Sequence, residues 1–157
     1  MAFLPTAGRF IITLAVLVIL GSFASTHFVL LGLTDLGVEI SAGDRLSMIL
    51  QDIVGIAPAY GAIFGAGLLI AFIAARYVTK LAPSQRKLVF LVAGGTAMAV
   101  TLAAFRLAFD GIMPISGART TPGFIAQIAV GVICGYLFAH LTTPARAKAG
   151  NDTKGMA

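Results

Sequence analysis

Four long apolar stretches dominate this sequence and decide what it can fold into. They lie at about residues 10–33, 58–79, 87–109 and 122–141. A helix needs about 20 apolar residues to cross a hydrocarbon core of about 30 Å, and each stretch meets that length. A membrane-spanning strand would need only about 10 residues, with alternating polar and apolar side chains that these stretches lack. The sequence therefore predicts an all-α integral membrane four-helix bundle, with residues 1–141 as a single transmembrane domain.

The composition excludes most classes of soluble protein. Apolar residues make up 59% of the chain and charged residues 11%, whereas a soluble domain averages about 45–50% and about 25%. So few charges cannot cover the surface of a soluble globule. Cys134 is the single cysteine, so no intrachain disulfide can form. The net charge of +5 comes from basic residues that flank the apolar stretches rather than alternate with aromatic residues, so we expect no nucleic-acid partner.

The basic residues predict the orientation of the chain. Cytoplasmic loops of membrane proteins are enriched in Lys and Arg close to the span ends. With the amino terminus inside, eight of the eleven basic residues face the cytoplasm: Arg9, Arg76, Lys80, Arg86, Lys87, Arg146, Lys148 and Lys154. We therefore expect both termini in the cytoplasm and a multi-pass protein of the plasma membrane, which we take to be a bacterial inner membrane.

The first apolar stretch also has features of a cleavable signal peptide. Arg9 precedes an apolar run, and small residues follow it at 22–25. The apolar character continues to Leu33, however, which is longer than the core of a typical signal peptide. The length favours a retained span, whereas cleavage would leave three spans and place the termini on opposite sides.

The first outer loop, residues 34–57, is too long and too patterned for a simple turn. Its apolar residues recur at helical spacing, as Leu46, Ile49, Leu50 and Ile53. This pattern predicts a short amphipathic helix along the outer interface, with Pro58 then marking the start of the second span. Residues 142–157 lack apolar periodicity, and we expect a mobile cytoplasmic tail there.

The polar residues that most suggest binding gather near the second outer loop. Arg106 and Asp110 stand four residues apart at the end of the third stretch, so one helix face can pair them. The start of the fourth helix offers unpaired N–H groups and a partial positive charge, which suit an anion. The sequence predicts an anion or lipid-headgroup site formed by Arg106, Asp110, Ser116, Arg119, Thr120 and Thr121. A capped turn with a snorkelling arginine is the alternative reading of the same residues.

His27 is an ionisable residue within the first predicted span, which makes it a candidate proton or polar relay. His140 falls near the opposite membrane face, so the two histidines cannot together hold a haem iron. The sequence has no cluster of His and Cys at metal-ligand spacing. We therefore expect neither a metal nor a cofactor.

Paired glycines in the second and fourth stretches predict helix-packing faces. Gly61 with Gly65, and Gly131 with Gly135, follow the small-xxx-small pattern that lets helix backbones approach closely in lipid. These faces can pack within one chain or against a second copy. Packing within one bundle is the interpretation we favour.

Three functions remain open on the sequence. The first is a non-enzymatic accessory or lipid-binding membrane protein that acts through its outer polar face, because most candidate binding polarity lies there. The second is a subunit of an oligomeric small transporter or channel, within a homo-oligomer or a larger membrane complex. The third is a membrane enzyme acting on a lipid headgroup, which is weaker because no nucleophile, base and orienting partner lie at one depth.

Overall fold

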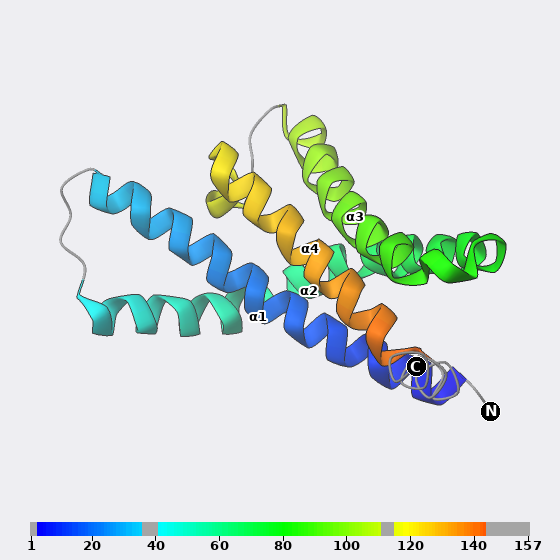
Figure 1. Ribbon diagram of the computed structural model, residues 1–157. Helices are drawn as coiled ribbons and strands as arrows, with labels where there is room; N and C mark the ends of the chain where they lie inside the picture. Colours follow the sequence, from blue (N-terminus) through cyan, green and yellow to red (C-terminus); the bar gives the residue numbers. More distant parts are fainter. Residues whose placement is uncertain (1–2, 36–40, 111–114, 144–157) are drawn as a thin grey trace, which may run out of the picture.

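The computed structural model describes residues 3–35, 41–110 and 115–143, and these residues are helical except in short connections (Figure 1). The elements are α1 (Phe3–Asp35), α2 (Ala42–Leu81), η1 (Pro83–Gln85), α3 (Arg86–Ala108), η2 (Ser116–Ala118) and α4 (Thr121–Leu141). Within the described part, four helical segments are long and apolar enough to cross a membrane: Thr6–Gly32, Pro58–Leu81, Pro83–Ala108 and Thr121–Leu141. The predicted all-helical, multi-pass class is confirmed. The predicted tail lies outside the described residues from 144 onward.

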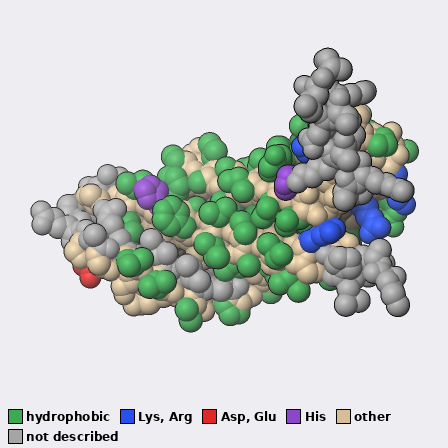
Figure 2. Space-filling model, turned by 60° about the horizontal axis from the view of Figure 1, so that its bottom comes forward, with side chains coloured by type: hydrophobic (Ala, Val, Ile, Leu, Met, Phe, Trp, Pro, Cys, Tyr) green, Lys and Arg blue, Asp and Glu red, His purple; other side chains and the backbone are tan. Residues whose placement is uncertain are grey.

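The spanning helices alternate in direction, so α1 begins and α4 ends at the same end of the bundle (Figure 1). We call this the arginine-rich end, because it carries Arg9, Arg76, Lys80, Arg86 and Lys87 (Figure 2). The opposite end, where α1 and α3 finish and α4 begins, is called the loop end. The described basic residues that the sequence assigns to one side of the membrane therefore gather at one end of the bundle.

The predicted helix boundary at Pro58 is wrong. α2 runs unbroken through Pro58 as one helix of 40 residues, so the expected short outer helix and the second span belong to a single element. The residues before Pro58 include no turn signal strong enough to end a helix, and a proline inside a membrane helix is tolerated where its surroundings satisfy the freed carbonyl. Ser41 begins the helix, since its hydroxyl accepts a hydrogen bond from the Asp44 N–H at 3.2 Å.

Large apolar side chains fill the centre of the bundle and also cover its outside. Leu17, Phe64, Leu68 and Met98 are almost completely buried. Many other apolar side chains point outward, and Ile70 on α2 is 70% exposed. A soluble protein would leave such a surface in water at high cost, whereas a bilayer solvates it.

The four glycines predicted as packing residues lie at two different helix contacts. On α2, a side chain at Gly61 or Gly65 would meet Val18 or Leu14 of α1. On α4, a side chain at Gly131 or Gly135 would meet the backbone of α3. Both glycine faces are thus occupied by neighbours within the chain, which explains how α3 and α4 approach so closely.

Candidate functional site

The loop end separates the residues predicted to form an anion site. Arg106 lies exposed in the last turn of α3, while Asp110 lies exposed beyond the end of that helix with a positive φ of 48°. Among the residues that the structure describes, no ion pair joins Arg106 to Asp110. The reason is geometric, because α3 ends at Ala108 and the four-residue spacing of a helix face does not extend to Asp110.

The remaining predicted residues form the short connection into α4. Thr120 caps α4, because its hydroxyl accepts a hydrogen bond from the Gly123 N–H at 3.2 Å. This hydroxyl therefore stabilises the first turn of the helix. Thr121 and Arg119 are exposed on either side of it, and Ser116 begins η2. Of this group, Ser116 is the residue that lines a cavity.

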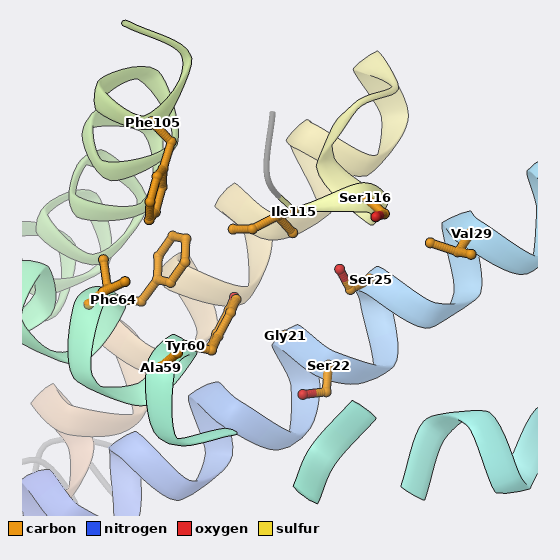
Figure 3. Close-up of a pocket in the computed structure, with 11 residues that line it drawn as sticks. Gly21, Ser22, Ser25, Val29, Ala59, Tyr60, Phe64, Phe105, Ile115 and Ser116 are labelled. Atoms are coloured by element: carbon orange, nitrogen blue, oxygen red, sulfur yellow. The ribbon is translucent and has the colours of Figure 1, made fainter. Parts of the chain in front are cut away.

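That cavity has a volume of about 410 Å³ and opens between α1, α2, α3 and η2 (Figure 3). Aromatic and aliphatic side chains from three elements form most of its wall, including Tyr60, Phe64, Phe105 and Ile115. Polar side chains are few. The volume and the apolar lining with a few polar groups are typical of a small-molecule or lipid site.

Three serines line this loop-end cavity: Ser22 and Ser25 from α1, and Ser116 from η2 (Figure 3). Ser22 is 2% exposed, and its Oγ has no hydrogen-bond partner in the part of the chain that the structure describes. A buried hydroxyl without a partner costs about 1–3 kcal/mol, so such groups are rare unless something else binds them.

A buried hydrogen-bond network forms the floor next to the cavity. The Tyr60 hydroxyl on α2 donates to Oε1 of Gln127 on α4 at 2.6 Å. Nε2 of Gln127 donates in turn to the carbonyl oxygen of Gly21 on α1 at 3.0 Å. The network therefore ties three helices together. A side chain at Gly21 would collide with the Tyr60 hydroxyl, so the close approach requires glycine.

Sequence reasoning missed this network, although a signal for it exists. Gln127 stands inside the fourth apolar stretch, where an amide needs hydrogen-bond partners from other helices. Tyr60 could not be found in this way, because tyrosines near span ends are common anchors at the membrane interface.

His27, the predicted relay, lies on the outside of α1. Its ring is exposed and stacks on Phe23 with the ring centroids 6.3 Å apart, and it meets Phe28 edge-on at 5.5 Å. These are apolar contacts on a surface rather than a chain of proton-carrying groups in the bundle interior. His140 likewise stacks on Tyr136 at the surface of α4.

No protein-family model, curated protein or solved structure matches this chain significantly.

Proposed function

We propose that this protein is a non-enzymatic membrane protein that binds a lipid at its loop end. One observation carries the proposal: an apolar cavity of about 410 Å³ is lined in part by Ser22, whose buried hydroxyl has no hydrogen-bond partner among the described residues. A lipid would place hydrocarbon against the aromatic wall and an ester or hydroxyl oxygen against Ser22. A single class of ligand would therefore contact the apolar wall and also bind the hydroxyl group.

The predicted outer-face arginines fit the same ligand. Arg106 follows the cavity residue Phe105 in α3, and Arg119 follows η2, whose first residue lines the cavity. Arginine is suited to phosphate and carboxylate groups because its guanidinium presents several donors in a fixed plane. The bound lipid is thus expected to carry an anionic headgroup, which reaches these exposed side chains at the bundle end.

The proposed orientation places the loop end outside the cell and both termini in the cytoplasm. The five basic residues of the arginine-rich end support it, because Lys and Arg near span ends mark the cytoplasmic side. The first part of α2, residues 42–57, then lies at the outer interface as an amphipathic extension of the second span. A bacterial inner membrane is the location we propose.

The experiment compares lipid binding by matched variants of the full-length protein in mild detergent. The probe is phosphatidylglycerol with a photoactivatable group in its acyl chain, and crosslinked peptides are located by mass spectrometry. Ile63→Trp narrows the cavity and should abolish crosslinks to its walls, whereas Ile70→Trp, on the exposed surface of the same helix, should not. Equal crosslinking in both variants would refute the proposal.

Ser22→Ala provides the second arm. It removes the unpartnered hydroxyl, so the ligand-free protein should become slightly more stable while lipid binding weakens. Opposite signs in these two measurements distinguish a ligand-binding hydroxyl from a structural one. A protein that loses stability on Ser22→Ala would argue for an internal role of that hydroxyl.

The oligomeric transporter or channel is the second candidate on the sequence, and its supporting feature was the pair of glycine faces. Both faces contact helices of the same chain, so they no longer favour a second copy. Crosslinking in native membranes tests it directly, since a defined homo-oligomer would favour that function. A lipid-headgroup enzyme would instead convert labelled lipid when purified.

A further inference from the structure

A second cavity lies at the other end of the bundle and differs in its chemistry. It has a volume of about 480 Å³ and opens where the start of α1 meets the ends of α2 and α4 and the start of α3. Three arginines line it, Arg9, Arg76 and Arg86, each from a different helix. Three guanidinium groups around one cavity repel one another, so an anion there would relieve that repulsion.

In the part of the chain that the structure describes, the acidic side chains that could neutralise these arginines lie elsewhere. Among the described side chains, the carboxylates belong to Asp44 and Asp110, and both are at the loop end. Figure 2 shows the same separation, with blue side chains gathered at the arginine-rich end and red at the opposite end. Within the described residues, this cavity therefore has a positive lining without an acidic partner.

Arg86 is held in place by its surroundings, unlike an arginine that snorkels freely. Its Nη2 donates to Oγ1 of Thr142 at 2.6 Å and also approaches the Thr142 carbonyl oxygen at 3.4 Å. The guanidinium carbon lies 5.0 Å from the centre of the Phe90 ring. Nε is buried and has no hydrogen-bond partner among the described residues. The Arg86 guanidinium that lines the cavity is thus fixed in position, and one of its donors is unpaired within the described residues.

The other walls of the cavity are suited to hydrocarbon. Phe72 and Phe138 stack with their ring centroids 4.6 Å apart, and Phe90 lies 5.5 Å from Phe138. The mouth is flanked by Leu69 and Ile73, which are 46% and 51% exposed on the outer face of α2. A ligand can therefore enter sideways from a bilayer, with its charged group at the arginines and its chains along the mouth.

We infer that this cavity binds the phosphate of an anionic phospholipid from the leaflet at the arginine-rich end. This site is separate from the loop-end cavity and adds to the proposed function. Bidentate pairing of guanidinium with phosphate oxygens explains why arginines rather than lysines line the cavity, although Lys80 and Lys87 lie at the same end.

The test measures binding of phosphatidylglycerol to the full-length protein in mild detergent by native mass spectrometry. Two ligand controls identify what is recognised: diacylglycerol with the same chains but no phosphate, and inorganic phosphate as a competitor. We expect phosphatidylglycerol to bind, diacylglycerol to fail, and millimolar inorganic phosphate to leave the lipid bound. Equal binding of diacylglycerol would overturn the role of phosphate, and displacement by inorganic phosphate would overturn the assignment to a lipid.

Matched variants distinguish the cavity from the general positive charge of this end. Arg9→Gln/Arg76→Gln should weaken binding about tenfold or more, because two charged donors are lost. Lys80→Gln/Lys87→Gln removes the same charge at the same end but outside the cavity, and should leave binding nearly unchanged. If both double variants lost phosphatidylglycerol binding equally, the inference would be overturned, because general attraction to the positive surface would then explain the binding.

A charge-neutral variant covers the case in which Arg86 is needed for folding. Arg86→Gln removes hydrogen bonds to the end of α4 and can unfold the protein, so it is not the deciding variant. Ile73→Trp narrows the mouth of the cavity without changing the charge and should reduce phosphatidylglycerol binding about tenfold. Photoactivatable phosphatidylglycerol should then no longer crosslink to peptides at the arginine-rich end. Unchanged binding and crosslinks would overturn the inference.

Discussion

The hydrogen bond between Tyr60 and Gln127 should couple α2 to α4 measurably. Tyr60 is 4% exposed and Gln127 is 1% exposed, so water cannot replace either partner when the other is removed. Tyr60→Phe removes the donor and keeps the ring, and Gln127→Met removes the amide while roughly keeping the length of the side chain. These two changes and their combination form a double-mutant cycle.

The expected magnitude follows from what each variant leaves behind. Tyr60→Phe strands Oε1 of Gln127, and Gln127→Met strands the Tyr60 hydroxyl, each at a cost of about 1–3 kcal/mol. The double variant strands neither atom. The bond from Gln127 to the Gly21 carbonyl is lost in both Gln127→Met and the double variant, so it cancels from the coupling. We expect a coupling of about 1 kcal/mol, within the range for hydrogen bonds between membrane helices.

The assay is equilibrium unfolding in mixed micelles of mild detergent and dodecyl sulfate, followed by circular dichroism. Gln51→Met is the matched control, because Gln51 is exposed and bonds only to the Ser47 hydroxyl at 3.1 Å in the described structure. The control should change the free energy of unfolding by less than about 0.5 kcal/mol. Strict additivity of the two single variants would refute the reasoning, because it would mean that the two side chains do not interact.

Three further predictions concern packing, helix capping and burial. Gly94→Ala should destabilise the fold by about 1–3 kcal/mol, because its Cβ would collide with the Gly131 backbone, whereas Gly32→Ala meets open space and should not; the same unfolding assay measures both. Ser41→Ala should weaken the start of α2 by about 1 kcal/mol, seen as faster amide hydrogen exchange in its first turn. Cys134 is 0% exposed and should react with a maleimide only after unfolding; reaction in the folded protein would contradict its placement.

The number and approximate position of the spans could be predicted from the sequence, because crossing a bilayer imposes a length and a hydropathy that are local properties. The gathering of basic residues at one end followed from the same local counting. The prediction that a helix begins at Pro58 was wrong for a physical reason. Proline removes one hydrogen bond from a helix, but this loss does not by itself end the helix, and α2 continues through Pro58.

The candidate sites were harder to predict, because they depend on which helices are neighbours. Ser116 was predicted as part of an outer polar group, but the wall of the loop-end cavity comes mainly from α1 and α2. Arg9, Arg76 and Arg86 were assigned to topology alone, since nothing in the sequence shows that three separate helix ends enclose one space. The order of contacts around a bundle is a tertiary property, and hydropathy does not contain it.

The two cavities should act independently because their polar ends lie far apart along α2. Tyr60 lines the loop-end cavity and Arg76 lines the other, and 16 residues of helix at 1.5 Å each separate them by about 24 Å. That distance is most of a hydrocarbon core of about 30 Å, so we expect the polar ends of the two cavities to face different leaflets. The nearest walls of the two cavities on α2 are Phe64 and Leu69, and the fully buried Leu68 lies between these residues. Ile63→Trp should therefore remove loop-end crosslinks while phosphatidylglycerol binding at the arginine-rich end keeps its affinity, and a change at both ends would show that α2 couples the two sites.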